Sequence, residues 1–268
     1  MRYLKGSIAI SEQHDIPLLL LVRNAAFITH KQLIALGSYD RSQSTMCSFL
    51  RRIRRLLAGE YLMLLDQRFE GNKVYAITRK GLEQLELCGH MLGSLNPEMP
   101  QIHHPAKMMH CLELNDIRIT FRRHNVLNYW LTDLEVCSDN LLNEDIYVKD
   151  YDAVVGLTLG PIDLQCAIEY ERSTKSVARY VDIRRQLALE TMVHAVIYIV
   201  KGVERILSIA ERLSSPNSRV LFVTASAFLR FGPDAYAMHT PVSGGALRDL
   251  LTQMAAMPIA TRTDLLVG

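Results

Sequence analysis

The sequence predicts an α/β (α+β) protein of two domains: a small helical domain with a β-hairpin, followed by a mixed sheet covered by helices. Three observations lead to this prediction. The chain has 268 residues, which favours two modest domains over one large one. Apolar residues recur at helical spacing in the first third and as short strand-like runs further on. A proline-rich segment, 93–105, separates the two patterns.

Composition and charge narrow the class of protein. Hydrophobic residues make up 49% of the chain and charged residues 22%, as in globular proteins. The net charge is only +2, but 41–80 holds nine basic and three acidic residues, leaving −4 for the rest. The five cysteines are scattered and never spaced C-x-x-C, which argues against a zinc site or a disulfide framework. The apolar run 16–22 is too short to span a bilayer, so we expect a cytoplasmic protein without a membrane segment.

The first third begins with two candidate helices. Residues 16–27 are mostly apolar and predict the first helix. Thr29 can cap a short second helix over 30–36, because its side chain can accept a hydrogen bond from the first turn. Gly37 ends that helix.

A third helix is predicted from a cap at Ser42 or Ser44 to about Ala58. Apolar residues recur in it at three- and four-residue steps, and basic residues occupy other positions. The basic residues are Arg51, Arg52, Arg54 and Arg55. Such a charge run usually keeps a helix face solvated, and this alternative stays open beside a binding role.

A hairpin and a fourth helix follow. Two strands, 61–65 and 74–77, flank a turn-rich tip at 68–73, and Thr78 caps a helix over 79–92. The order helix, helix, helix, strand, turn, strand, helix resembles a winged helix-turn-helix. In that module the third helix enters the major groove and the basic hairpin tip touches phosphate.

The resemblance implies contact with double-stranded DNA. The start of the third helix would face bases, and the arginines further along would grip the backbone. The predicted DNA-binding residues are Ser42, Ser44, Arg51, Arg52, Arg54, Arg55, Arg68 and Lys73.

The second domain is predicted to follow a linker. We predict a first domain of residues 1–92, a linker over 93–105 and a second domain of 106–268. In the second domain, 106–123 has helical spacing and 126–136 is typical of a strand. The further elements are strands over 150–159 and 162–171, a helix over 176–191, a strand over 195–200, a helix over 203–213 and a strand over 219–224. This order predicts a mixed sheet covered by helices, while the tail beyond 228 has no assigned place apart from a helix over 246–256.

Three acidic residues on two of these strands are the main candidates for chemistry. Side chains alternate along a strand, so Glu169 and Glu171 share one face, and Asp152 lies on the neighbouring strand. Carboxylates on a buried strand repel each other and are costly to desolvate. A hard divalent cation, Mg²⁺ or Mn²⁺, relieves that cost because it binds oxygen ligands. The alternative is that the strand lies at a sheet edge, where water solvates the acids.

The strand order, with an acid on the second strand and an acidic pair on the third, resembles the restriction-endonuclease-like PD-(D/E)xK fold. Asp152 and Glu169 match its pattern, whereas Glu171 stands where that pattern has lysine. Together with the winged helix, the arrangement resembles the replication-relaxation family, including MOBC-type plasmid relaxases. Those proteins carry an aspartate, then Glu-x-Glu and a Ser/Thr-rich turn, as residues 169–174 do, and often a histidine where His110 stands.

The resemblance implies a metal-dependent endonuclease that nicks one DNA strand at a transfer origin and starts plasmid mobilisation in conjugation, without a tyrosine nucleophile. Asp152, Glu169 and Glu171 would be its catalytic, metal-binding acids. Asp152 would bridge the metal, Glu169 would be the second ligand, and Glu171 would complete the site or orient a water molecule. Lys175 could supply the missing ammonium to the phosphate, although a surface lysine is the simpler alternative. Accessory mobilisation proteins are the further partners implied.

Other functions stay open at this point. Glu171 at the lysine position agrees with an inactive nuclease-like domain, in a DNA-binding repressor or replication initiator. A homodimer that cuts both strands is another alternative, with 176–189 as a surface that could pack a partner. The histidine pair 103–104 lies in a proline-flanked linker, which disfavours a tyrosine relaxase. The chain has no nucleotide-binding glycine motif, which disfavours nucleotide-driven work.

Overall fold

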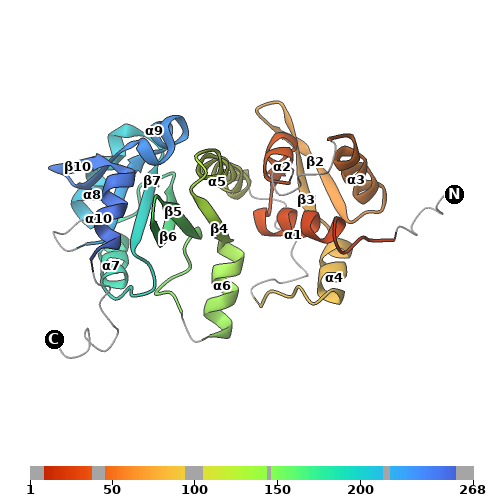
Figure 1. The fold of residues 1–268 in the computed structure, drawn as a ribbon, viewed down its shortest axis with the longest axis horizontal. Helices are drawn as coiled ribbons and strands as arrows, with labels where there is room; N and C mark the ends of the chain where they lie inside the picture. Colours follow the sequence, from red (N-terminus) through yellow and green to blue (C-terminus); the bar gives the residue numbers. More distant parts are fainter. Residues whose placement is uncertain (1–8, 38–45, 94–104, 144–145, 214–217, 258–268) are drawn as a thin grey trace. The chain divides into compact units, whose positions relative to one another are not determined.

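The structure is a computed structural model, and it describes residues 9–37, 46–93, 105–143, 146–213 and 218–257 (Figure 1). Its internal contacts divide the chain into two compact units, Met1–Ile119 and Thr120–Gly268. The predicted linker, 93–105, falls outside the described residues except at its two ends. Within the described ranges, the helices are all too short or too polar to cross a bilayer.

The first unit follows the predicted order of three helices, a hairpin and a further helix. Its elements are α1 Asp15–Ala25, β1 Ile28–Thr29, α2 His30–Gly37, α3 Met46–Ala58, β2 Leu62–Phe69, β3 Asn72–Ile77 and α4 Arg79–Leu87. The strands form an antiparallel sheet in the order β1-β3-β2. The sequence does not predict β1, because two residues carry no alternating pattern.

Two helix caps are present at the predicted residues. The Thr29 hydroxyl accepts a hydrogen bond from the Gln32 amide at 3.1 Å, and the Thr78 hydroxyl accepts one from the Gly81 amide at 3.1 Å. The caps predicted for the third helix, Ser42 and Ser44, lie outside the described residues.

The hairpin between β2 and β3 turns more tightly than predicted. Its two turn residues, Glu70 and Gly71, have φ angles of 48° and 76°, and Phe69 pairs with Asn72 across them. Two consecutive positive φ angles are typical of the primed turns that match the twist of a hairpin. Arg68 and Lys73, predicted as turn residues, are therefore strand residues that pair across the hairpin.

The core of the first unit fixes the orientation of α3. Leu19 and Val22 of α1 pack in one hydrophobic cluster with Phe49, Ile53 and Leu56 of α3. These three α3 residues recur at four- and three-residue steps, so one stripe of the helix faces inward. The arginines of α3 are left to its other faces.

The second unit continues from the last turn of α5, Pro105–Arg123, which spans the boundary between the units. Its elements are β4 Leu127–Thr132, α6 Asp133–Leu142, β5 Ala153–Leu159, β6 Ile162–Glu171, α7 Val177–Ala188, β7 Ala195–Val200, α8 Val203–Leu213, β8 Val220–Thr224, α9 Ala225–Phe231, a 3₁₀ turn Gly232–Asp234, β9 Tyr236–Thr240, β10 Ser243–Ala246 and α10 Leu247–Ala255.

These strands form one sheet in the order β10-β9-β8-β7-β6-β5-β4. The strands β4, β5 and β6 form an antiparallel meander, and α7 leads from β6 to the parallel strand β7, with β8 also parallel. Helices cover this mixed sheet, so the second unit has the α+β architecture, a mixed sheet covered by helices, that the sequence predicts. The part of the chain beyond residue 228 forms β9, β10 and α10. The two strands extend the sheet in antiparallel pairing.

One predicted strand was too long. The run 126–136 ends as β4 at Thr132, and α6 begins at once. The Glu135 carboxylate accepts a hydrogen bond from the Thr132 amide at 2.9 Å, which is half of a capping box. Thr132 and Glu135 have the spacing of that motif, so this helix start was present in the sequence but was not predicted.

The two faces of the sheet are covered by different helices. Tyr180 of α7 and Ile209 of α8 pack in one cluster with Ala167 and Tyr198, which point to one face. On the opposite face, Phe121 of α5 contacts Trp130 of β4 and Phe228 of α9, with ring centroids 6.4 and 4.7 Å apart. The central strands β6 and β7 are therefore buried on both faces, as parallel strands in such sheets are.

Replacing Gly81 with alanine should destabilise the first unit. Alanine normally favours a helix over glycine by about 1 kcal/mol. A Cβ at this position, however, would lie 2.3 Å from the carbonyl oxygen of Tyr61, the residue before β2, so α4 would have to move away from it. We expect a loss of about 1–3 kcal/mol in the free energy of unfolding. Urea titration of Gly81→Ala measures it, with the exposed Glu86→Ala in the same helix as control; a gain in stability would show that α4 is free to shift.

Candidate active site

The predicted acids Glu169 and Glu171 lie at the carboxyl end of β6, in the middle of the sheet. Strand β5 begins at Ala153, opposite Ile168, so the last three residues of β6 pair only with β7. Glu169 and Glu171 are nevertheless buried, with only 6% and 3% of their surface exposed to solvent. The alternative of a solvated sheet edge is therefore wrong, because β6 is an interior strand and both acids are buried.

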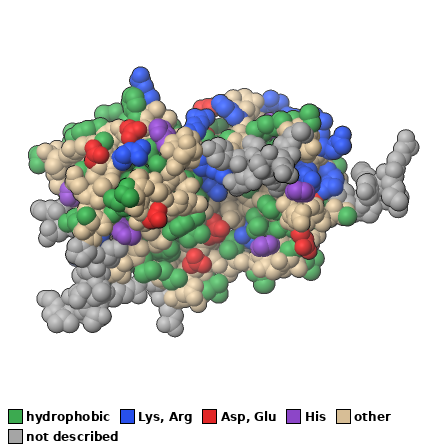
Figure 2. All heavy atoms as spheres, in the orientation of Figure 1, with side chains coloured by type: hydrophobic (Ala, Val, Ile, Leu, Met, Phe, Trp, Pro, Cys, Tyr) green, Lys and Arg blue, Asp and Glu red, His purple; other side chains and the backbone are tan. Residues whose placement is uncertain are grey.

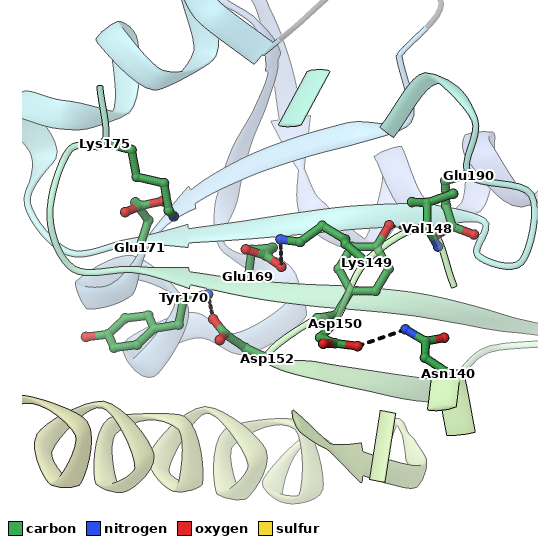
Figure 3. A network of polar contacts seen from close by, with 11 residues as sticks. Asn140, Val148, Lys149, Asp150, Asp152, Glu169, Tyr170, Glu171, Lys175 and Glu190 are labelled. Atoms are coloured by element: carbon green, nitrogen blue, oxygen red, sulfur yellow. Dashed lines mark hydrogen bonds and ion pairs between the residues drawn. The ribbon is translucent and has the colours of Figure 1, made fainter. Parts of the chain in front are cut away.

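Asp152 lies beside them, just before β5. Its carboxylate accepts a hydrogen bond from the Tyr170 amide at 2.7 Å. The side chain of Asp152 thus takes the place of the ladder partner that Tyr170 loses where β5 stops. A backbone contact fixes the position of this carboxylate next to the two glutamates (Figure 3).

Each buried glutamate is paired with a lysine. The Lys149 ammonium lies 2.5 Å from a Glu169 carboxylate oxygen, and the side chains are 14% and 8% exposed. The Lys175 ammonium donates to Glu171, with side chains 36% and 4% exposed. Figure 3 shows both glutamates on the same side of β6, each directed toward its lysine. The sequence predicted Lys175 at this site but missed Lys149.

Burial dominates the electrostatics of this group. It raises the pKa of Glu169 to about 7; the charge of Lys149 opposes the rise and that of Asp152 adds to it. Burial lowers the pKa of Lys175, but the hydrogen bond and the charge of Glu171 outweigh it, so the net shift is upward. Asp152 and Lys149 thus lie close enough to Glu169 to influence its ionisation, and they do so in opposite directions.

The Tyr198 hydroxyl is buried in the same place without a partner. Tyr198 pairs with Glu169 across β6 and β7, is fully buried, and its hydroxyl makes no hydrogen bond in the structure. Burial raises the pKa of this hydroxyl, and the charges of Glu169, Glu171 and Asp152 raise it further. A buried hydroxyl without a partner is costly, so this point of the site calls for a water molecule or a ligand.

The donor set fits a hard divalent cation in chemistry and in charge. When all are ionised, three carboxylates against two ammonium groups leave one negative charge. Oxygen donors are what Mg²⁺ and Mn²⁺ bind. In the part of the chain that the structure describes, however, no three His, Cys, Asp or Glu side chains converge as a metal site. The glutamates face their lysines instead, and convergence would require a lysine to move.

The predicted DNA-binding arginines of α3 fall into two pairs. Arg52 and Arg55 contact the fully buried Asp15 of α1, Arg52 at 3.3 Å. Arg51 and Arg54 are exposed. Two of the four arginines therefore hold α3 against α1, and the other two are open to solvent.

The remaining predicted DNA-binding residues lie on the hairpin or outside the described residues. Arg68 and Lys73 are exposed on β2 and β3, close to the turn. Ser42 and Ser44 lie in the stretch that the structure does not describe. On the face seen in Figure 2, most of the visible lysine and arginine side chains gather over the first unit.

No family model matches the chain, and no curated protein matches it. Among solved structures, the chain is similar to the restriction endonuclease FokI bound to DNA, with a TM-score of 0.26 and 10% sequence identity. The match covers 84% of this chain and 45% of the FokI chain, so the chain spans less than half of that protein.

Asp15→Ala should destabilise the first unit, because it leaves two arginine side chains without their buried partner. The ion pairs are partly solvated on the arginine side, so we expect a loss of about 1–3 kcal/mol, below that of a fully buried pair. Thermal or urea unfolding measures it, with the exposed Arg51→Ala as control. Equal stabilities of Asp15→Ala and the wild type would mean that the pairs do not hold α3.

Proposed function

We propose that the chain is a metal-dependent endonuclease that binds DNA through its first unit and nicks one strand at a specific site. The observation that carries this proposal is the buried acidic group at the end of β6. Glu169 and Glu171 share one face, Asp152 lies beside them, and one negative charge remains after two lysines are counted. The restriction-endonuclease-like sheet is a scaffold on which such a group can cleave phosphodiesters.

Asp152, Glu169 and Glu171 would hold Mg²⁺ or Mn²⁺ in this proposal. When bound, such an ion lowers the pKa of a coordinated water molecule and offsets charge on the phosphate. The amide of Tyr170 keeps Asp152 in place. Lys175 is the more exposed of the two lysines, which suits contact with a phosphate arriving from solvent.

The first unit would bind double-stranded DNA as a winged helix. Its element order and its antiparallel β1-β3-β2 sheet support this proposal. The exposed Arg51 and Arg54 on α3, with Arg68 and Lys73 on the hairpin, would contact phosphates. Arg52 and Arg55 would act indirectly, by holding α3 in place through Asp15.

A relaxase that nicks a plasmid transfer origin is the finer form of this proposal. It is supported by the Glu-x-Glu pattern and the Ser/Thr-rich turn of 169–174, now at the end of a central strand. Tyr180 and Tyr198, near the acids, are only 1% and 0% exposed, which disfavours either as a nucleophile toward DNA. Hydrolysis by an activated water molecule agrees better with this site than a covalent tyrosine adduct.

One observation favours a second function. The chain would then be a DNA-binding repressor or replication initiator with an inactive nuclease-like domain. Lys149 and Lys175 already neutralise both buried glutamates, so the site has charge partners without a metal ion. In that case the first unit would bind DNA and the second would serve as a scaffold.

The nuclease proposal predicts relaxation of a supercoiled plasmid that carries the DNA flanking this gene, in the presence of Mn²⁺ or Mg²⁺. Asp152→Asn and Glu169→Gln should each slow nicking by about a hundredfold or more, because each removes a charge from the metal-binding group. Agarose gels resolve supercoiled, nicked and linear DNA. The control is Asp163→Asn, an exposed acid near the other end of β6. Full activity in either active-site variant rules out the assignment, and DNA binding without nicking by the wild type favours the repressor.

The DNA-binding proposal predicts that Arg51→Ala with Arg54→Ala weakens binding and flattens its salt dependence. Each lost phosphate contact lowers the slope of log K against log salt by about 0.9, so the pair should lower it by nearly 2. Fluorescence anisotropy with a labelled duplex over a salt series measures the slope. Arg79→Ala is the control, because Arg79 is exposed on α4 and pairs with Glu83. An unchanged slope in the double variant would exclude these arginines from the interface.

A further inference from the structure

Lys149 is the more deeply buried of the two lysines in the acidic group. Its side chain is 14% exposed, against 36% for Lys175, and its ammonium lies 2.5 Å from Glu169. The same ammonium lies 5.3 Å from the centre of the Tyr151 ring. Lys149 therefore reaches the end of β6 from the segment before β5, along a path between an aromatic ring and a carboxylate.

The segment that carries Lys149 is irregular but fixed by neighbouring side chains. Asn140 of α6 accepts a hydrogen bond from the Tyr147 amide and donates one to Asp150, each at 2.9 Å. These two contacts lie on either side of Lys149 in the sequence. They anchor the segment to the end of α6 (Figure 3).

A second anchor comes from the far end of α7. A single Glu190 carboxylate oxygen accepts hydrogen bonds from the Val148 amide at 3.3 Å and the Tyr151 hydroxyl at 2.7 Å. The residues before and after Lys149 are thus held from both sides. This anchoring directs the ammonium at Glu169 and reduces the entropy lost when the pair forms.

A divalent ion bound to the Glu169 carboxylate would lie within a few ångström of the Lys149 ammonium. Like charges a few ångström apart in a partly buried site repel each other, so binding of a metal ion there opposes the contact between the ammonium and Glu169. Lys175 has more freedom to withdraw, because it is more exposed. The fixed segment around Lys149 opposes its withdrawal.

We propose that Lys149 is the built-in counter-ion of this site: it holds Glu169 when no metal ion is bound and competes with the metal ion for that carboxylate. This inference rests on the proposed function, because it takes the acidic group to be a metal site. Lys149 is then a positioning residue that sets the metal affinity of the group. It also holds the Glu169 carboxylate in position before the metal ion arrives.

The test measures Mn²⁺ binding to the full chain without DNA, by isothermal titration calorimetry. Lys149→Gln removes the competing charge, and we expect it to bind Mn²⁺ at least about tenfold more tightly than the wild type. Lys149→Arg keeps the charge and should bind Mn²⁺ no more tightly than the wild type. The matched control is Lys175→Gln, which removes the same charge from the more exposed pair and should have a smaller effect.

The outcomes separate this inference from the nuclease proposal. If Mn²⁺ binds Lys149→Gln more tightly but the wild type never nicks DNA, the inference stands and the nuclease proposal fails. Unchanged or weaker binding in Lys149→Gln overturns the inference, and so does tighter binding in Lys149→Arg. Glu169→Gln added to Lys149→Gln should abolish the gain, and a gain that persists would place the ion elsewhere. Should Lys149→Gln fail to fold, Lys149→Met removes the same charge and keeps the aliphatic stem.

Discussion

The burial of two like-charged carboxylates at the end of a central strand is the constraint on which the site depends. Glu169 and Glu171 are only 6% and 3% exposed: β7 pairs with this end of β6, and Asp152 occupies its other side, where β5 has stopped. Their desolvation must be offset by opposite charge. Lys149 and Lys175 supply it, and each requires a local structure that delivers its ammonium. The irregular segment before β5 and the turn into α7 are therefore parts of the same electrostatic arrangement.

The sequence predicted the acidic part of this arrangement because strand geometry is periodic. A buried run with two acids two residues apart places both on one face, and Glu169 and Glu171 lie there. Asp152 was predicted as a strand residue, whereas β5 begins one residue later. Its carboxylate replaces a ladder partner, and no pattern in the sequence indicates where pairing stops. Lys149 was missed for a similar reason, since its segment has no period and is held by side chains from α6 and from beyond α7.

The four arginines of α3 look alike in the sequence, but packing gives them different roles. The four arginines of α3 form one run, but a helix turns 100° per residue and presents them to different surroundings. Arg52 and Arg55, three residues apart, both reach Asp15, which is fully buried in the first turn of α1. Arg51 and Arg54 have the same spacing and face solvent. No local pattern links Asp15 to α3, so the sequence alone could not separate the structural arginines from those available to DNA.

The buried lysine–glutamate pairs are relevant to both proposed functions. Their cost in stability helps to decide between a nuclease and an inactive scaffold. Replacing a buried ion pair by well-packed apolar residues is often neutral or stabilising, so the fold alone does not require Glu169 with Lys149 or Glu171 with Lys175. The Tyr198 hydroxyl is likewise buried beside the acids without a protein partner, where a phenylalanine would avoid the cost of desolvation. In the proposed nuclease, a metal ion with its water molecules would compete with the lysines and would offer the hydroxyl a partner, which accounts for both features. Asp152 adds a third carboxylate to the two that pair with lysines, and oxygen donors suit a divalent ion, which favours the nuclease proposal over the inactive scaffold.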